Sequence, residues 1–327
     1  MKKIVILHSD ISPDAGRDEL DCLQQAEAIA DALRQLRYEP ILLPFELNLN
    51  NSITLLQSLK PYVVFNIVET LDSKGSLIHF APAILDYLRI PYTGCCTEAV
   101  FQTSNKPLAK KIMRCSGIPT PDWLEQDGFA SQHDHAETYI IKSSWEHASI
   151  GLDENSLIPY KDKADILKEM GLRQETLGGS CYAEAYIEGR EFNVALISDK
   201  QDVNVLPIAE MLFNDYAPDK LKIVDYKAKW EADSFEYNNT IRKFVFDDKD
   251  SKLITSLREI SLQCWHLFSL SGYARVDFRV DTNGKPWVLE VNTNPCLSPD
   301  AGFAAALKEA KIKYQEAIGW IIDNALK

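Results

Sequence analysis

Short apolar segments alternate with helical periodicity along the first hundred residues. Apolar residues run almost without interruption over 3–8, 40–45 and 62–68, as they do in strands that are buried on both faces of a parallel sheet. Leucine and isoleucine recur at helical spacing over 20–36, and 78–88 is a second helix candidate. This alternation predicts a parallel sheet wrapped by helices.

A second group of elements begins near Ser104. Residues 106–115 and 163–170 show helical patterns, and 138–142 and 181–187 are short apolar strands. Farther on, strands are expected over 191–198, 273–281 and 287–292, and helices over 252–270 and 303–325. The intervening stretch 211–246 has mixed polarity and little period, so it is expected to be a large loop that crosses a site.

Charge and composition narrow the classes of partner. The 327 residues carry 35 Lys and Arg against 48 Asp and Glu, a net charge of −13. Such a surface repels nucleic-acid backbones and anionic lipids, so neither nucleic acid nor a membrane is expected as a partner. The seven cysteines show no metal-binding spacing and are expected to be reduced thiols. The chain start reads as a buried strand rather than a leader, and we expect a cytoplasmic protein.

A hairpin near the C-terminus is the most informative passage. Asn283-Gly284 between two alternating strands is a strong signal for a two-residue turn. That turn places Asp277 opposite Glu290. In the same register, Arg275 lies opposite Asn292. Side chains two residues apart share a face, so these four polar groups are expected to form one cluster.

The opposite face of this hairpin is apolar and is expected to belong to the core; it comprises Val276, Phe278, Leu289 and Val291. On the polar face, directly opposed carboxylates destabilise a sheet unless a cation lies between them. Carboxylate and amide oxygens suit Mg²⁺, and a neighbouring arginine suits a developing phosphate charge. The alternative is a solvated edge hairpin in which Arg275 merely pairs with the acids.

In order along nearly the whole chain, the sequence resembles the ATP-grasp superfamily and, within it, the D-alanine–D-alanine ligases. The resemblance rests on residues 64–66, 90–94, 105–106, 117–121, 139–143, 184–191, 225–230 and 275–295. It implies an α/β (α+β) fold of three domains with an N-terminal parallel sheet. The implied boundaries are 1–103, 104–189 and 190–327, the last domain carrying the metal site and the substrate loop. The implied activity is an ATP- and Mg²⁺-dependent carboxylate–amine ligase that forms an acyl phosphate.

The resemblance also implies site residues, carried over position by position. Those implied for ATP are Lys106, Lys142 and Ser149 at the phosphates, Glu184, Ala185 and Ile187 at the adenine, and Glu191 at the ribose. Those implied for one or two Mg²⁺ ions, with Mn²⁺ as a substitute, are Asp277, Glu290 and Asn292. The catalytic candidates are Arg275, Lys229 and Cys296, and the substrate candidates are Glu19, Trp230, Ser298 and Asp300.

The departures from the family pattern concern the substrates. Cys296 replaces a usual glycine, Ala301 replaces a hydroxyl that would hold the acceptor carboxylate, and Ala148 replaces a serine of the phosphate loop. Asp300 would repel an acceptor carboxylate, so we expect an acceptor that carries an amine without an adjacent carboxylate. The expected partners are then a small-molecule carboxylate and an amine, and the resemblance suggests a homodimer because the family is often dimeric.

Other functions stay open at this stage. One is D-alanine–D-alanine ligase activity itself, and another is a non-catalytic regulator that binds ATP on the same fold. A dinucleotide-binding protein is disfavoured because no G-x-G-x-x-G follows the first strand.

Overall fold

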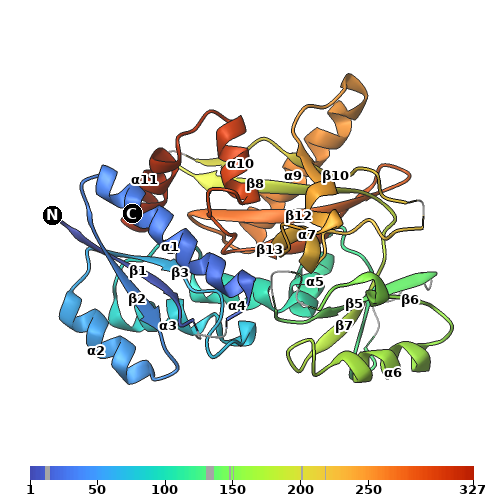
Figure 1. Cartoon of the computed structure of the whole chain (residues 1–327), viewed down its shortest axis with the longest axis horizontal. Coiled ribbons are helices and arrows are strands. Elements are labelled where there is room, and N and C mark those ends of the chain that lie inside the picture. The colour runs from blue at the N-terminus through green and yellow to red at the C-terminus, as the bar shows by residue number, and fades with distance from the viewer. Residues whose placement is uncertain (12–14, 130–135, 147–148, 150, 200–201, 218) are drawn as a thin grey trace.

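The structure is a computed structural model that describes residues 1–327 except 12–14, 130–135, 147–148, 150, 200–201 and 218. Within the described residues, three sheets occupy separate parts of the molecule (Figure 1). This mixed α/β architecture, with a parallel sheet at the N-terminus, agrees with the predicted fold class.

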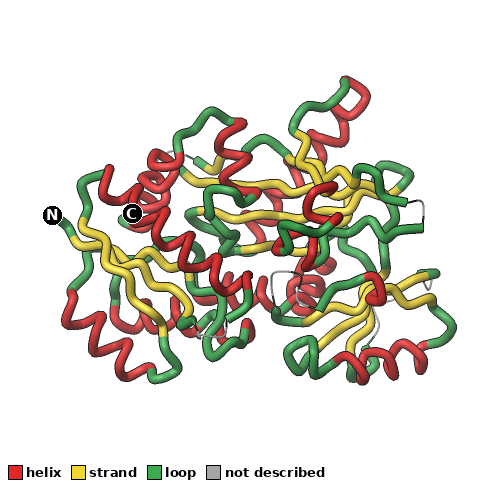
Figure 2. Tube along the Cα trace, in the orientation of Figure 1, coloured by secondary structure: helices red, strands yellow, loops and turns green. Residues whose placement is uncertain are grey.

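The N-terminal sheet is parallel, with the strand order β2-β1-β3. Its elements are β1 (Lys3–Ser9), α1 (Arg17–Gln35), β2 (Glu39–Phe45), α2 (Leu49–Leu59), β3 (Val63–Ile67), η1 (Gly75–Leu77) and α3 (Phe80–Leu88). Ile4 and Ile6 pack in a core with residues of α1, whereas Val5 and Leu7 pack with residues of α2 and α3. Both faces of β1 are therefore covered, which explains its uninterrupted apolar run. Figure 2 shows helices on both sides of this sheet.

The second sheet is antiparallel, with the order β4-β7-β5-β6. The elements of this region are α4 (Thr97–Ser104), α5 (Lys106–Cys115), β4 (Trp123–Glu125), β5 (Thr138–Ser143), η2 (Glu154–Ser156), β6 (Leu157–Pro159), α6 (Lys163–Arg173) and β7 (Cys181–Ala185). The N-cap of α5 is Asn105, whose side chain accepts the Leu108 N–H at 3.0 Å. Because Pro107 follows in the first turn, helix α5 starts where the sequence predicts.

The third sheet has the order β11-β10-β8-β12-β13, and β9 pairs with β8. Its strands are β8 (Gly189–Ser198), β9 (Val203–Val205), β10 (Ala209–Phe213), β11 (Thr240–Lys243), β12 (Tyr273–Asp281) and β13 (Pro286–Asn292). The helices of this region are α7 (Tyr226–Trp230), α8 (Phe235–Asn239), η3 (Asp248–Asp250), α9 (Ser251–Leu267), α10 (Gly302–Glu309) and α11 (Tyr314–Ala325).

Two predictions about this last region are wrong. The stretch 211–246 is not one loop, because it contains α7, α8 and β11. The predicted helix over 303–325 is two helices, α10 and α11, separated at Lys311, which has a positive φ of 60°. Helix α11 turns back onto α1, and its Ile318 and Ile321 join the core beneath the N-terminal sheet. The chain end therefore packs beside the chain start (Figure 1).

The predicted cross-strand pairs of the hairpin are confirmed: Asp277 lies opposite Glu290 and Arg275 opposite Asn292. The predicted two-residue turn is wrong. The Asp281 N–H donates to the Lys285 carbonyl at 3.1 Å, so three residues separate the last bonded pair.

A register shift compensates for this longer turn. It falls between Asp277 and Phe278, so Phe278 lies opposite Val288. Val288 is buried in the core, whereas Leu289 lines the cavity described below. The expectation that Leu289 belongs to the core face is therefore wrong, because the bulge places two residues of β13 on the cavity side.

Among the described residues, no helix is long and apolar enough to cross a membrane.

Candidate active site

A cavity of about 840 Å³ lies between the sheets. Its lining comes from α1, from β5 and β7, from β8, β12 and β13, and from the segment between β10 and β11. The predicted site residues all line it except Glu19 and Ser298. Residues far apart in the sequence therefore meet in one place.

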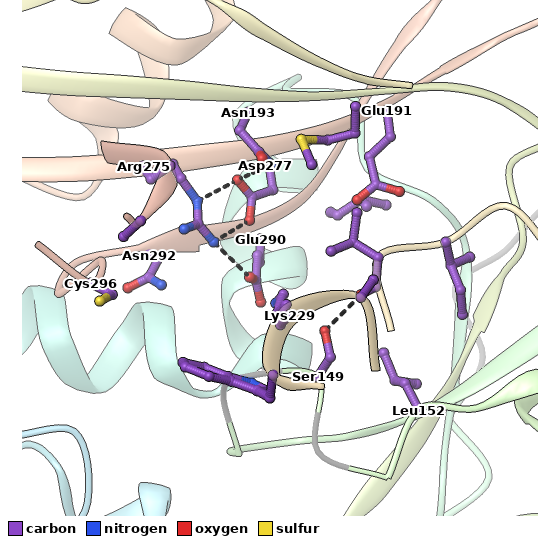
Figure 3. Close-up of a pocket in the computed structure, with 18 of the residues that line it drawn as sticks. Ser149, Leu152, Glu191, Asn193, Lys229, Arg275, Asp277, Glu290, Asn292 and Cys296 are labelled. Carbon is purple, nitrogen blue, oxygen red and sulfur yellow. Dashed lines mark hydrogen bonds and ion pairs between the residues drawn. The ribbon is translucent and has the colours of Figure 1, made fainter. Parts of the chain in front are cut away.

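Strand β12 supplies a charged row to this cavity. Arg275, Asp277 and Arg279 alternate along it and all face the same space. Arg275 donates to both oxygens of Asp277, from Nε at 2.7 Å and from Nη2 at 2.8 Å. Asn193 Nδ2 donates to Asp277 Oδ1 at 2.8 Å. Glu290 lies opposite, with Oε1 3.9 Å from Arg275 Nη2, as Figure 3 shows.

Asp277 is only 8% exposed, which contradicts the alternative of a solvated edge hairpin. Burial raises the pKa of its carboxyl, although Arg275 opposes this rise. Two carboxylates thus share one guanidinium in a place largely screened from water. The single positive charge of Arg275 does not balance the two carboxylates, so a further cation would stabilise them.

Three lysines bring ammonium groups to the same cavity: Lys106, Lys142 and Lys229. Lys106 Nζ donates to the Glu146 carbonyl at 2.7 Å, and burial lowers the pKa of Lys106. Burial, followed by the nearby Arg275, lowers the pKa of Lys229. Desolvated cations with lowered pKa values are stabilised by an anionic ligand, because such a ligand favours the charged form.

Glu184, which is expected at the adenine, lines the cavity and also pairs with two lysines. Its carboxylate is 1% exposed and lies 2.6 Å from Lys142 Nζ and 2.7 Å from Lys110 Nζ. Only the Lys142 contact has hydrogen-bond geometry. Burial would raise the pKa of Glu184, but the two lysines hold it below its usual value. Glu184 therefore orients Lys142 and has less freedom to contact a ligand.

Ala185, Ile187 and Glu191 also line the cavity. Glu191 is 8% exposed and accepts a hydrogen bond from Arg279 Nη1 at 3.1 Å. Burial raises the pKa of Glu191. In Figure 3, Glu191 and Cys296 lie on opposite sides of the acid pair.

The segment that carries Lys229 crosses the cavity, as the sequence predicts for 211–246. Ser149 Oγ donates to the Val224 carbonyl at 2.8 Å, and Arg17 Nη1 donates to the Trp230 carbonyl at 3.1 Å. The segment is therefore bonded to both sides of the cavity. Of the predicted phosphate loop 146–151, residues 147, 148 and 150, including the noted Ala148, lie outside the described residues.

Cys296 is not placed as a nucleophile. Its Sγ donates to Asp21 Oδ2 at 2.9 Å, and Ser298 Oγ donates to Asp21 Oδ1 at 2.9 Å. Burial, then the charges of Asp21 and Glu69, raise the pKa of Cys296 well above its usual value. A thiol held in its protonated form is a weak nucleophile, so the structure argues against Cys296 as a catalytic nucleophile. Ser298 is buried and supports Asp21 instead of lining the cavity.

Glu19, which is expected to hold a substrate, lies outside the cavity lining. Its carboxylate accepts the Gly16 N–H at 3.1 Å and the Ser73 hydroxyl at 3.2 Å. Asp300 does line the cavity, and it is exposed. Its backbone carbonyl accepts a hydrogen bond from Arg242 Nη1 at 3.4 Å. A cation therefore stands beside Asp300, which weakens the expected repulsion of an acceptor carboxylate.

Comparison with known proteins decides the family. Residues 116–323 match the family model described as "D-ala D-ala ligase C-terminus". A D-alanine–D-alanine ligase of Aquifex aeolicus is 30% identical over 307 residues, which cover 92% of this chain and 94% of that protein. The chain belongs to the D-alanine–D-alanine ligase family. It is an ATP-dependent carboxylate–amine ligase.

Other similar proteins agree with this family fold. A Sinorhizobium fredii protein called "Uncharacterized protein y4sG" is 29% identical over 306 residues, covering 92% of this chain and 87% of that one. The crystal structure of D-alanine–D-alanine ligase from Bacillus anthracis complexed with ATP aligns with a TM-score of 0.73. It is 21% identical and covers 100% of this chain and 98% of that chain. The ATP-grasp fold is thus confirmed.

Several lining residues of this ligase were missed from the sequence. Arg279 shares the two-residue period of Arg275 and Asp277, and that signal could have revealed it. Asp21 shares a helical face with Arg17, which would have pointed to it. Arg242 comes from β11, in a stretch without period, and no sequence signal marks it.

Proposed function

We propose that this ligase uses magnesium-bound ATP to convert the carboxylate of an amino acid into an acyl phosphate, and then joins it to the amine of a second small molecule. The observation that carries the proposal is one cavity that is lined by three lysines, by Arg275 and by the opposed carboxylates of Asp277 and Glu290. Phosphoryl transfer needs positioning and charge stabilisation more than a covalent nucleophile.

In this proposal, Lys106 and Lys142 neutralise phosphate oxygens of ATP, each as a point charge. Lys142 is held for this role by the buried Glu184, 2.6 Å away. Ser149 belongs to the loop over the phosphates. At the other end, Ala185, Ile187 and Glu191 take the nucleoside, with the Glu191 carboxylate accepting from ribose hydroxyls.

Asp277, Glu290 and Asn292 fit a magnesium ion. Their oxygens are the ligand type that Mg²⁺ prefers, and Asp277 and Glu290 together carry more negative charge than Arg275 offsets. When bound, the ion, Mg²⁺ or its substitute Mn²⁺, would polarise phosphoryl oxygens. Asp277 would then exchange part of its contact with Arg275 for the ion.

The chain's own groups supply the remaining steps. Arg275 stabilises charge on the transferred phosphoryl group. Lys229 contributes a second positive charge from α7, and the segment around it excludes water from the reactive acyl phosphate. The amine then attacks the acyl carbon, and inorganic phosphate leaves.

The names of the similar ligases specify D-alanine, which we propose as the first amino acid to test at the donor position. Trp230 and Asp300 line the cavity, and we assign them to its acceptor side. We further propose a division into domains at 103/104 and 189/190, a homodimer in solution and a cytoplasmic location.

The test measures ADP release with Mg-ATP across a panel of amino acids and amines, followed by mass spectrometry. We expect one acid–amine pair to release ADP and to give a product one water lighter than the sum of its parts. EDTA should abolish the reaction. Asp277→Asn should lower the rate by a factor of about 100 or more. Asp281→Asn is the matched control, because Asp281 lies on the same strand outside the cavity lining. Its carboxylate accepts hydrogen bonds from the Asn283 and Lys285 N–H groups and from Trp287 Nε1.

Loss of activity in Asp281→Asn as severe as in Asp277→Asn would argue against a metal role for Asp277. ADP release that stays at background with every pair, while ATP still binds, would contradict the proposed donor and acceptor classes.

A further inference from the structure

Arg279 carries a buried guanidinium group close to Ile187 and Glu191, at the end of the cavity proposed to take the nucleoside. Its side chain is 4% exposed, and it follows Arg275 and Asp277 on the same face of β12. Its hydrogen bonds reach Ile187 O from Nε at 2.9 Å, Glu191 Oε2 and Lys222 O from Nη1 at 3.1 and 2.7 Å, and Tyr186 Oη from Nη2 at 3.0 Å. One side chain thus joins three separate segments that line or adjoin the cavity.

The first segment connects β7 to β8. The Tyr186 N–H donates to the Thr138 carbonyl at 3.0 Å, and the Ile187 carbonyl is taken by Arg279. Within the part of the chain that the structure describes, the Ile187 N–H has no acceptor. Because Ile187 lines the cavity, this rigidly held peptide leaves a donor for a ligand. A heteroaromatic ring nitrogen is a suitable acceptor for it.

The second segment is the start of β8. Burial raises the pKa of Glu191, and the charge of Arg279 opposes that rise. Arg279 therefore favours the ionised carboxylate, which accepts hydrogen bonds from hydroxyl groups. It also fixes the orientation of Glu191 through the 3.1 Å hydrogen bond.

The third segment is the one that crosses the cavity. Lys222 offers its carbonyl to Arg279 at 2.7 Å, and seven residues later the same segment carries Lys229. A bond between two charged or polar groups that is screened from water is stronger than the same bond on the surface. Arg279 thereby ties the segment to the nucleoside end.

We infer that Arg279 is a positioning residue for the nucleoside half of the ATP site. It presents the Ile187 N–H and the Glu191 carboxylate to adenosine, and it fixes the crossing segment at Lys222. Ser149 and Arg17 bond that segment closer to Lys229, at the Val224 and Trp230 carbonyls, without Arg279. This inference rests on the proposed function. The phosphate end and the nucleoside end then have separate supports, because Glu184 holds Lys142, whereas Arg279 holds Glu191 and the segment between β7 and β8.

The test separates the two ends of the nucleotide. Binding of ADP and of magnesium tripolyphosphate to the wild type and to Arg279→Met is measured by calorimetry. We expect the affinity for ADP to fall about 10- to 100-fold, and the affinity for tripolyphosphate to stay within about threefold. Arg279→Lys, which keeps the charge but not the forked geometry, should lie between the wild type and Arg279→Met for ADP.

Arg190→Met is the matched control. Arg190 lies on the neighbouring strand β8 and donates to Glu210 and Asp250 at 2.6–3.2 Å, outside the cavity lining. It should lower thermal stability without changing the preference for ADP over tripolyphosphate. In the ligase reaction, both Arg279 variants should raise KM for ATP while kcat changes by less than about threefold.

Three outcomes would overturn the inference: unchanged ADP binding in both Arg279 variants, an equal loss for ADP and tripolyphosphate, or the same altered preference in Arg190→Met. If Arg279→Met does not fold, ADP and tripolyphosphate binding by Arg279→Lys decides whether the inference holds. Absence of ADP binding by the wild type would overturn the proposed nucleotide site itself, which distinguishes the two failures.

Discussion

Lys110→Met tests the buried ion pair that holds the phosphate end of the site. Lys110 is fully buried, and its ammonium group lies 2.7 Å from Glu184 Oε2. It also donates to Thr120 Oγ1 at 2.7 Å and to the Pro121 carbonyl at 3.1 Å. Burial lowers the pKa of Lys110 to about 8, so the ammonium form depends on its partner. Methionine keeps the length of the side chain and removes the charge.

The expected loss of stability is large because Glu184 would stay buried with Lys142 as its remaining cation. Removing one partner of a buried pair costs about 3–5 kcal/mol. For a cooperative unit of 150–250 residues, this corresponds to a fall in Tm of about 6–20 °C. Adding Glu184→Gln to Lys110→Met should recover much of that loss, because replacing both partners removes the unpaired charge.

The assay is thermal and urea unfolding of the variants, followed by circular dichroism. Lys111→Met is the control, since Lys111 is the next residue of α5 and its ion pair with Glu125 at 2.8 Å is half-exposed. That pair is worth about 0–1 kcal/mol. If Lys110→Met were no less stable than Lys111→Met, the reasoning about the buried pair would be refuted.

Three further predictions concern other parts of the ligase. Cys296→Ser should keep ligase activity within about threefold of the wild type, and the wild-type thiol should react slowly with iodoacetamide at pH 8, because the pKa of Cys296 is raised. A loss of ligase activity above a hundredfold in Cys296→Ser would indicate a catalytic role for this thiol. Gly189→Ala should lower Tm by several degrees or prevent folding, because the new Cβ would lie 2.0 Å from Val280 O at a φ of 144°; Gly284→Ala, with no atom within 4 Å, should cost only about 1 kcal/mol. The folded-state pKa of Glu184 is lowered below its unfolded value, so Glu184 stabilises the fold at pH values above the usual glutamate range, and this stabilisation is lost as the pH falls through the lowered pKa. The check is to measure the unfolding midpoints of the wild type and of Glu184→Gln as the pH is lowered. Midpoints that fall in parallel would contradict the prediction.

The sequence alone was sufficient for most elements of the N-terminal and central regions. Continuous apolar runs predicted β1 and β3, and a helical pattern predicted α5. These are local signals, since burial period and cap chemistry are set by neighbouring residues. The polar face with Asp277 opposite Glu290 was also predicted correctly, although the turn was assigned the wrong length. A bulge restored the register, and no local rule foretells a bulge.

What only the tertiary structure decided are the contacts between segments distant in sequence. Glu184 stays charged while buried because Lys110 from α5 and Lys142 from β5 both pair with it. The raised pKa of Cys296 depends first on its burial and then on the charge of Asp21, 275 residues earlier in the chain. Periodicity gives the face on which a side chain lies, but not the partner that it meets. Desolvation and charge pairing arise only when the sheets close around the cavity, so the sequence determined the type of chemistry and the packing determined which residues can perform it.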